Sequence, residues 1–346
     1  MNRVYVQGLG AVSPAGWGIG SLCSAVQGHA NVPVRPLARP GWEQPLWVRP
    51  MPAPSPKPAF LSHARFRRSS AIAHYVAAAA LEAIGVGPAS PDRFGSRLGL
   101  VICLTAGCVT YSRRLYEEIL EDPVIASPIL FPETVFNAPA SHLAAYLGVD
   151  GAVYTLVGDN GAFLQGLALA ATWLAQGQLE ACVVVGAEEV DWVVADALRL
   201  FKRDAVLGGG AGALYLGRDR SAGIAELNCV TDSFSFVVHQ SRQLAASRMR
   251  AQLPPCDDRE LLCLGTQKLP RADAPEADAW EDWSGLRLAP KETLGEAFTA
   301  SAGWQCVIAC DAIRRRQTPA ANVSVVGINQ QAIGARFVSV GASNGR

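Results

Sequence analysis

Apolar residues along this chain form short runs that alternate with longer helical segments, a pattern typical of α/β proteins. The clearest unit covers residues 153–189. Val153–Val157 is a run of apolar and β-branched residues, which predicts a buried strand, and residues 158–161 have turn-forming types. Residues 162–176 are apolar on nearly every face, so we expect an interior helix. A second buried strand is predicted at 181–185.

The same patterns predict strands and helices on both sides of this unit. The first strand, at 3–8, leads into a glycine-rich segment at 9–16. The other expected strands are 97–104, 208–216, 224–230, 260–265, 323–328 and 337–340. The expected helices are 19–26, 71–84, 112–120, the second part of 131–147, 192–203, 241–252 and 296–316.

Composition indicates a globular protein and limits its partners. The chain has 346 residues, of which 50% are hydrophobic and 17% are charged, enough apolar material for a large core. The formal net charge is +0, which gives no electrostatic indication of nucleic acid or a membrane surface. Nine scattered cysteines, and a start without signal-peptide character, predict buried free thiols in the reducing cytoplasm, with neither metal nor cofactor.

The strand–turn–helix–strand unit resembles the nucleophile region of the β-ketoacyl synthases, enzymes of the thiolase superfamily. In that family a cysteine in the turn precedes a buried helix that ends in glycine, and the next strand ends in a Gly-Gly-x-Glu-Glu type motif. Gly177, Gly186, Glu188 and Glu189 match at the family's spacing. Counting back along the helix, the cysteine position falls on Asn160, whose carboxamide is not a nucleophile.

The resemblance also implies that the two catalytic histidines are replaced. The first histidine lies in an Ala-His-Gly-Thr motif, which here reads Cys-Leu-Gly-Thr at 263–266, so its position falls on Leu264. The second follows Lys-x-x-x-Gly, which here is 291–295, so its position falls on Glu296. Lys291 is retained, and we expect it to form a buried ion pair with Glu296 that is structural rather than catalytic.

The resemblance covers most of the chain and implies the fold. It is most specific at 9–16, 137–217 and 291–303. A member of this superfamily has the five-layered αβαβα thiolase-like fold, built from two related halves. We therefore expect a ketosynthase-like N-terminal half at 1–220 and a shortened C-terminal half at 221–346.

A condensing-enzyme shell without its Cys-His-His triad predicts a non-catalytic partner. Type II polyketide systems pair an active ketosynthase with a similar chain-length factor that lacks the cysteine. The two form a heterodimer across the strand equivalent to Val153–Val157. The resemblance thus predicts a chain-length-factor-type subunit, in polyketide, aryl-polyene or fatty-acid-like biosynthesis. Its partners would be an active β-ketoacyl synthase and an acyl carrier protein.

Two other functions stay open from the sequence. A repurposed acyl-thioester enzyme for acyl transfer, hydrolysis or cyclisation would use a new pocket lined by Asp159, Glu296, Lys291 or His142. A homodimeric scaffold would instead hold an acyl carrier protein. Carrier proteins are acidic, so basic residues are the candidate contacts. These are Arg65, Arg67, Arg68 and the arginines of the segment 242–250.

Overall fold

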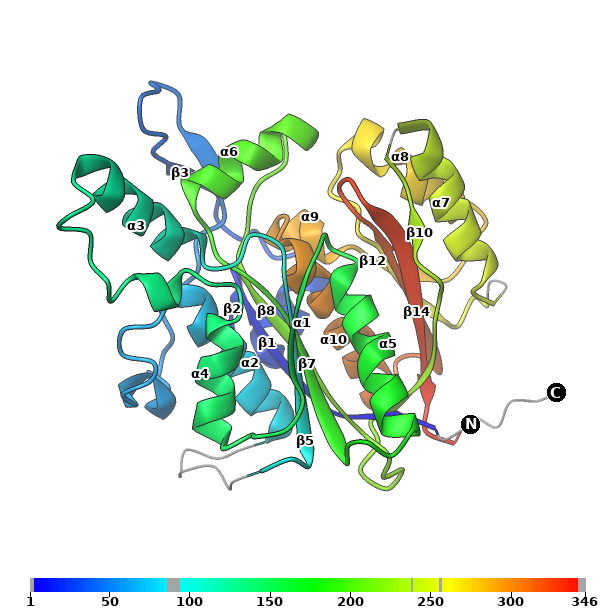
Figure 1. The fold of residues 1–346 in the computed structure, drawn as a ribbon. Helices are drawn as coiled ribbons and strands as arrows, with labels where there is room; N and C mark the ends of the chain where they lie inside the picture. The colour runs from blue at the N-terminus through cyan, green and yellow to red at the C-terminus, as the bar shows by residue number, and fades with distance from the viewer. Residues whose placement is uncertain (1–2, 86–93, 238, 255–256, 342–346) are drawn as a thin grey trace.

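The computed structural model describes residues 3–85, 94–237, 239–254 and 257–341 (Figure 1). The strands are β1 Tyr5–Ser13, β2 Gly16–Trp17, β3 Arg35–Leu37, β4 Leu46–Val48, β5 Leu98–Leu104, β6 Val153–Val157, β7 Ala181–Glu188, β8 Gly210–Gly217, β9 Ala225–Val230, β10 Phe234–Ser235, β11 Leu261–Cys263, β12 Leu286–Leu288, β13 Ala320–Val326 and β14 Gln331–Ser339. The helices are α1 Ile19–Gln27, α2 Ala71–Ile84, α3 Val109–Glu121, α4 Ala138–Leu147, α5 Ala162–Ala175, α6 Trp192–Phe201, α7 His239–Ala251, α8 Pro270–Ala279, α9 Pro290–Leu294 and α10 Phe298–Arg314.

The strands form two groups with the same topology. The first group has the order β1-β8-β7-β5-β6, and the second has the order β9-β14-β13-β11-β12. β1 pairs antiparallel with β8, and β9 pairs antiparallel with β14 in the same way. At the far end of each group three strands are parallel: β7, β5 and β6 in the first, and β13, β11 and β12 in the second. A short antiparallel pairing of β1 with β9 joins the groups into one continuous sheet, and we call its two parts the first and the second sheet. The predicted two related halves are therefore confirmed, whereas their division at residue 220, between β8 and β9, stays a prediction.

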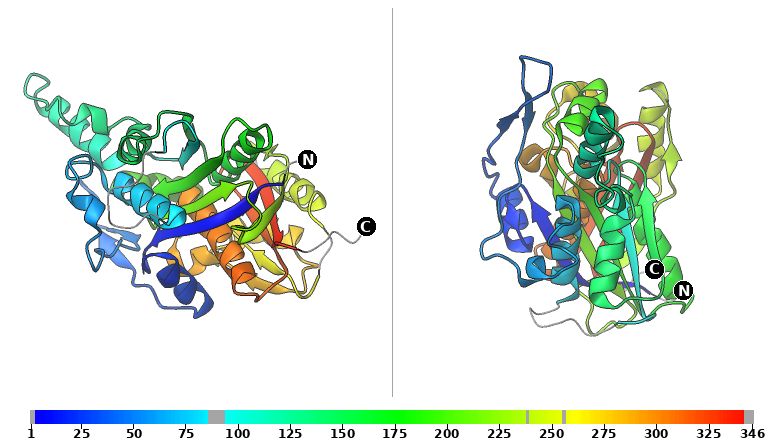
Figure 2. Two further views of the ribbon diagram at one scale, coloured as in Figure 1. Left: turned by 90° about the horizontal axis from the view of Figure 1, so that it is seen from below. Right: turned by 60° about the vertical axis from the view of Figure 1, so that its left-hand side comes forward.

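Helices cover both faces of each sheet and give five layers (Figures 1 and 2). α2 packs on β1, β8 and β7 with α4 beside it, and α7 and α8 pack on the outer face of the second sheet. α5 and α10 lie between the two sheets, and α10 contacts strands of both halves. This is the predicted αβαβα arrangement.

The central helix α10 is buried on all sides. Every residue from Phe298 to Ile313 is buried, so its polar side chains need partners inside the protein. Thr299 Oγ1 donates to the Cys103 carbonyl at 2.8 Å, and Gln305 Nε2 donates to the Ser324 carbonyl at 2.8 Å. These two bonds attach the helix to a strand of each half. The helix begins at Phe298, so Glu296, which the sequence placed inside it, lies before it.

The first strand is longer than predicted. β1 continues through the glycine-rich segment to Ser13 and pairs with β8 along almost its whole length. Gly8 and Gly10 face the backbone carbonyls of Ala83 and Ala79 in α2, which leave no room for a Cβ atom. The glycines therefore serve close helix packing rather than a turn, which is why the sequence signal was misleading.

β6 lies at an edge of the sheet, so the prediction of a buried strand was wrong. Its bounds are as predicted, but among the described strands it pairs only with β5. Tyr154 is 52% exposed and Val157 is 57% exposed. Apolar composition indicates a strand, but it does not tell whether a neighbour in the same chain covers that strand.

Substituting Gly212 tests the contact between β8 and α10. A Cβ atom at Gly212 would lie 2.5 Å from the Gly303 carbonyl carbon and 2.7 Å from the Trp304 nitrogen, both of them backbone atoms. We expect Gly212→Ala to lower the free energy of unfolding by about 1–3 kcal/mol because one of the two elements must shift. Urea denaturation monitored by circular dichroism measures this loss.

Gly20→Ala is the matched control for this substitution. Gly20 lies in α1, and a Cβ atom there meets nothing within 4 Å. Alanine favours a helix over glycine, so this variant is expected to unfold at the same or a slightly higher urea concentration. An equal loss of stability in both variants would contradict the proposed steric cause.

Candidate functional site

Asn160 lies in the turn between β6 and α5 and is completely buried. Its Nδ2 donates to Glu296 Oε1 at 2.8 Å and to the Phe298 carbonyl at 3.2 Å. Asn160 comes from the first half and Glu296 from the second, so this amide ties the halves together. The oxygen of the Asn160 side chain, Oδ1, is buried and has no hydrogen-bond partner among the described residues.

Glu296 is the centre of a buried ionic cluster. Its Oε2 lies 3.1 Å from Lys291 Nζ and 3.6 Å from Lys202 Nζ, and it accepts a hydrogen bond from Gln267 Nε2 at 2.7 Å. Its Oε1 accepts hydrogen bonds from the Asn160 side chain and from the backbone N–H of Phe298. The predicted buried ion pair between Lys291 and Glu296 is therefore present. Sequence reasoning missed Lys202 and Gln267, because neither stands in a motif that points to a distant carboxylate.

The Lys-x-x-x-Gly spacing has a local geometric reason. The short helix α9 carries Lys291 and ends at Gly295, whose φ of 82° is in the region that favours glycine. The turn brings the side chain of the next residue, Glu296, back onto Lys291. The Glu296 N–H donates to the Val206 carbonyl at 2.8 Å, and the Gly208 N–H donates to the Glu296 carbonyl at 2.7 Å. These backbone hydrogen bonds hold Glu296 against the loop that follows α6.

The cluster fixes the protonation state of Glu296. Burial alone would raise the pKa of this carboxyl, but the ammonium groups of Lys291 and Lys202 and the amide of Asn160 lower it to about 2. Burial lowers the pKa of Lys202 to about 8, against the opposing influence of Glu296. At neutral pH Glu296 is thus a carboxylate whose oxygens are occupied by donors. A group with so low a pKa is a poor general base and cannot act as an acid near pH 7.

Leu264 does not join Asn160 and Glu296. It lies in a hydrophobic cluster of the second half that contains Trp280, Trp283 and Phe236. Gln267, three residues further on, reaches Glu296 instead. The structure thus brings together two of the three positions that the resemblance singled out. Whether these residues replace the family's catalytic ones stays a prediction.

The other candidates for a new pocket have separate environments. Asp159 faces the loop before β14: its Oδ1 accepts from the Gly161 N–H at 3.1 Å and its Oδ2 accepts from the Gln330 N–H at 3.1 Å. Burial raises the pKa of its carboxyl. His142 lies in α4, in the outer layer, with its Nε2 2.9 Å from Glu133. The structure does not bring His142 to the Glu296 cluster.

Arg242 and Arg250 are not available as carrier-protein contacts, which corrects the prediction for them. Arg242 is 7% exposed, and its Nη2 donates to the Gly327 carbonyl at 2.9 Å. Arg250 donates to the Pro254 carbonyl at 2.8 Å and stacks over Trp280 at 4.4 Å. Both side chains turn inward from α7, because that helix covers a sheet and its long side chains fill the interface. Arg248 is exposed, as are Arg65, Arg67 and Arg68.

The adjacent acids Glu188 and Glu189 have a structural role. The Glu188 carboxylate accepts backbone N–H bonds from Thr105 and Ala106, and Glu189 accepts the Thr110 N–H at 2.8 Å. They therefore tie the end of β7 to the loop after β5 and to the first turn of α3. Burial raises the pKa of Glu188 to about 8.

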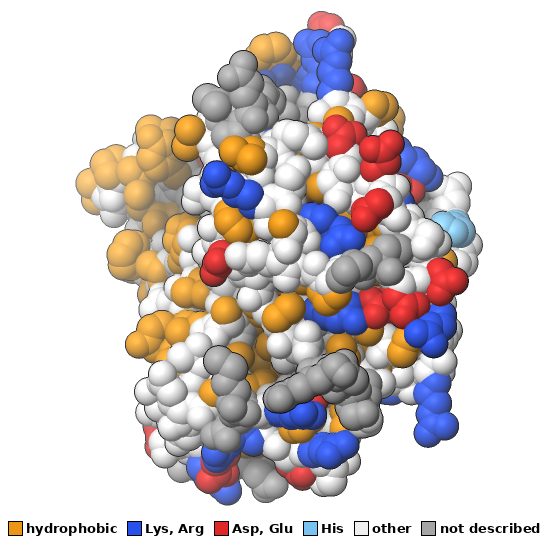
Figure 3. Space-filling model, turned by 90° about the vertical axis from the view of Figure 1, so that its right-hand side faces the viewer, with side chains coloured by type: hydrophobic (Ala, Val, Ile, Leu, Met, Phe, Trp, Pro, Cys, Tyr) orange, Lys and Arg blue, Asp and Glu red, His pale blue; other side chains and the backbone are white. Residues whose placement is uncertain are grey.

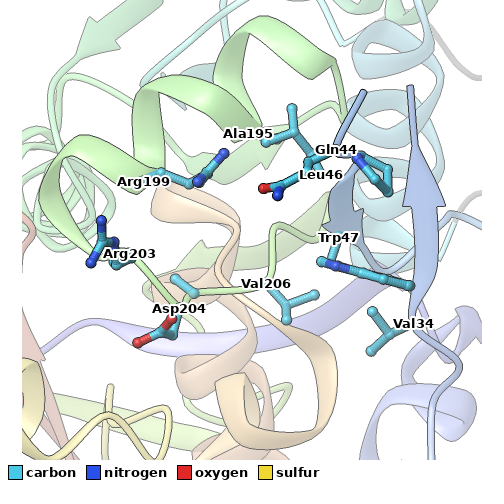
Figure 4. A pocket seen from close by; sticks show the side chains of 11 residues that line it. Val34, Gln44, Leu46, Trp47, Ala195, Arg199, Arg203, Asp204 and Val206 are labelled. Atoms are coloured by element: carbon cyan, nitrogen blue, oxygen red, sulfur yellow. The ribbon is translucent and has the colours of Figure 1, made fainter. Parts of the chain in front are cut away.

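Two large cavities flank the loop that carries Lys202. One, of about 640 Å³, is lined by Lys202, Arg242 and residues at the start of α8. The other, of about 540 Å³, lies between the β3–β4 hairpin and α6, with Trp47 and Arg199 in its wall (Figure 4). Arg203 and Asp204 line both.

Three further kinds of functional feature concern the described residues: metal ligands, reactive thiols and membrane-spanning helices. No group of three or more His, Cys, Asp or Glu residues there could hold a metal ion. The eight described cysteines are free, and burial raises the pKa of Cys108 and Cys182 to about 12, which keeps these thiols protonated. Within the same residues, none of the helices has both the length and the apolar character needed to span a bilayer.

The fold was compared with known proteins. No family model and no curated protein sequence matches the chain. Solved structures match over almost all of it. The ishigamide ketosynthase/chain length factor has a TM-score of 0.80 at 18% identity, and the match covers 98% of this chain and 100% of that one. A β-ketoacyl synthase from Burkholderia phymatum STM815 has a TM-score of 0.80 at 17% identity, with coverages of 98% and 100%.

The chain has a β-ketoacyl synthase fold. A third similar structure is that of AntDE:AntF, a type II polyketide synthase acyl-carrier protein in complex with its ketosynthase bound to the hexaketide. Its TM-score is 0.75 at 13% identity, with coverages of 98% of this chain and 99% of that one. Identities this low show the ketosynthase fold, and the function has to be argued from the residues.

Removing the charge of Glu296 tests the cluster. Glu296→Gln removes the ion-pair partner of the buried Lys291 and Lys202, so we expect a loss of about 3–5 kcal/mol in the free energy of unfolding at pH 7. The folded-state pKa is lowered from 4.5 to about 2, so the ionised carboxylate stabilises the fold above pH 4.5. That contribution disappears as the pH falls towards 2. The gap between wild type and variant should therefore narrow over this window in urea titrations.

Glu292→Gln provides a control of the same chemistry. Glu292 pairs with Lys268 at 3.0 Å near the surface, where the lysine side chain is 78% exposed. Its loss should cost less than about 1 kcal/mol, because exposed ion pairs contribute little. If the two variants lost similar stability, or if the gap for Glu296→Gln did not change with pH, the central role of this carboxylate would be refuted.

Proposed function

We propose that this chain is a chain-length-factor-type partner of an active β-ketoacyl-ACP synthase, in polyketide, aryl-polyene or fatty-acid-like biosynthesis. The observation that carries the proposal is the environment of Asn160. A condensing enzyme of this fold needs a nucleophile at the start of the interior helix that corresponds to α5. Here that place is taken by a carboxamide whose nitrogen is bonded to Glu296 and Phe298.

The chemistry of the cluster supports a non-catalytic subunit. An amide cannot form a thioester, and the carboxylate at the position of the second histidine is held ionised by two lysines. The position of the first histidine carries Leu264, whose side chain neither donates nor accepts a hydrogen bond. In the proposed role the Cys-His-His triad is therefore absent, and the partner supplies the chemistry.

The surface around β6 supports pairing with another subunit. An edge strand leaves backbone N–H and C=O groups unpaired, and β6 adds the exposed side chains of Tyr154 and Val157. Apart from β6, the segment that follows α3, which projects from the molecule in Figure 2, exposes Ile125, Ile129 and Phe131 at 68%, 64% and 62%. Hydrophobic side chains also gather along the left side of the view in Figure 3. Exposed apolar area of this kind is typical of a protein interface.

The proposed partners follow from these features. The similar structures include a ketosynthase/chain length factor and a ketosynthase in complex with an acyl-carrier protein. For this chain we propose a heterodimer with an active ketosynthase in the cytoplasm. The exposed Arg65, Arg67 and Arg68 would contact the acidic carrier protein.

The heterodimer is tested by charging the β6 edge. Val157→Lys should weaken binding to a ketosynthase from the same genome by about ten-fold or more, since an unpaired ammonium would be buried in the interface. Leu286→Lys is the matched control: Leu286 is also an exposed apolar residue of an edge strand, at the opposite end of the sheet order, and is 62% exposed. Binding is measured by calorimetry or co-purification. A stable homodimer that ignores every ketosynthase offered, or equal effects of both substitutions, would argue against the proposal.

The absence of covalent catalysis is tested by mass spectrometry. The isolated chain, incubated with acyl-thioesters and with acyl carrier protein, is expected to gain no acyl mass and to turn over none of them. The active partner treated in the same way serves as the positive control. Turnover by the isolated chain that disappears in Glu296→Ala would support a repurposed enzyme instead.

A further inference from the structure

The cavity of about 640 Å³ beside the Glu296 cluster is basic. It lies between the end of α6, α7 and the start of α8, and its lining includes Lys202, Arg203, Arg242 and Arg271, with Asp204 as an acidic residue. We call it the basic cavity. Arg203 and Arg271 are exposed, whereas Lys202 and Arg242 are 5% and 7% exposed, at its inner end. Cations that line a hollow focus a positive electrostatic potential inside it.

The two buried cations have spare hydrogen-bond donors. Arg242 gives one Nη2 N–H to the Gly327 carbonyl at 2.9 Å, and its guanidinium carries further N–H groups. Within the same part of the chain, the ionic partner of Lys202 is Glu296, at 3.6 Å, which is longer than the 3.1 Å between Lys291 and the same oxygen. Both side chains therefore keep N–H groups for an acceptor that enters the cavity.

Neighbouring carboxylates are already engaged elsewhere. Asp273 Oδ2 accepts the backbone N–H groups of Gln267 and Leu269 at 2.9 Å and 2.8 Å, in the first turn of α8. Glu276 Oε1 accepts the Gly265 N–H at 3.0 Å. These acids lower the free-energy cost of burying cations nearby. However, Asp273 Oδ2 and Glu276 Oε1 already accept hydrogen bonds from backbone N–H groups.

We propose that the basic cavity binds a small organic anion, a carboxylate or a phosphate, through Lys202 and Arg242, with Arg203 and Arg271 at its mouth. A planar guanidinium and an ammonium together match an anion with two or three oxygen acceptors. The volume falls in the range of small-molecule sites, roughly 300–1,000 Å³. This inference does not rest on the proposed partner role, since it uses the cavity and its donors alone.

Anion binding should depend on pH. Lys202 has a pKa of about 8, and it is flanked by Glu296 and Lys291, by Arg242 of α7, and by Asp273 and Glu276 of α8. Rising pH removes the charge of Lys202. Burial also raises the pKa of Glu276, and the ionised form of this carboxyl adds a negative charge to the same region. Both changes oppose an anion, so affinity should fall by about five-fold between pH 8 and pH 9.

Calorimetric titration of the full chain with sodium malonate and with inorganic phosphate, at constant ionic strength and pH 7, tests the proposal. Saturable binding of either anion above a sodium chloride control is expected. A preference for phosphate assigns the cavity to phosphate esters, and a preference for malonate assigns it to carboxylates. Neutral malonamide should not bind. If neither anion binds, the proposal is overturned.

Variants locate the binding to this cavity. Lys202→Met should weaken binding by about ten-fold or more, because it removes the buried charge. The double variant Arg203→Ala, Arg271→Ala changes exposed residues only and should weaken binding by a smaller factor, which keeps the test decisive if Lys202→Met does not fold. Arg199→Ala, an exposed arginine of α6 outside the lining, should bind like wild type. Equal affinity in all variants would place the anion elsewhere and refute the assignment.

Discussion

The Glu296 carboxylate is the contact on which the interior arrangement depends. A buried charge is tolerated only when ionic and hydrogen-bond partners surround it, and each partner here comes from a different segment. Lys291 is in α9, Lys202 follows α6, Gln267 follows β11 and Asn160 precedes α5. These segments belong to both halves, so the halves must dock correctly before the charge is compensated.

The ketosynthase fold is stabilised by packing contacts that do not involve Asn160, Leu264 or Glu296. α10 is buried throughout and lies so close to β8 that glycines are required where the backbones meet. Glu188 and Glu189 hold the loop after β5 through backbone N–H groups. None of these contacts needs a cysteine at the head of α5. The fold can therefore match ketosynthase structures at only 13% to 18% identity.

The centre and the two candidate binding regions are chemically distinct. At the centre, Asn160 Nδ2 donates a hydrogen bond to Glu296, an arrangement that fixes both side chains in place. At the edge, β6 offers unpaired backbone and apolar side chains, the chemistry of a protein partner. Between α6 and α8, the basic cavity offers buried cations with spare donors, the chemistry of a small anion. The proposed protein partner and the proposed anion would thus bind on two different sides of this core.

The sequence by itself determined the elements and the class of fold. The bounds of α2 and β6 are those that local hydrophobic pattern predicts, since both depend on residues close in the chain. The pairing of Lys291 with Glu296 also follows from a local turn at Gly295. Two assignments failed for a related reason: the glycines of β1 and the apolar residues of β6 carry a local signal whose meaning depends on which distant element covers them.

Only the tertiary structure decided the composition of the site. Lys202 meets Glu296 across 94 positions of sequence, Gln267 replaces Leu264 as the neighbour of that carboxylate, and Arg242 turns inward although it lies in a basic helix. Long side chains reach across layers, and no spacing rule records where they end. Charge compensation in a buried interior is a property of the packed chain, because the partners become neighbours only when both sheets and the helices between them are in place.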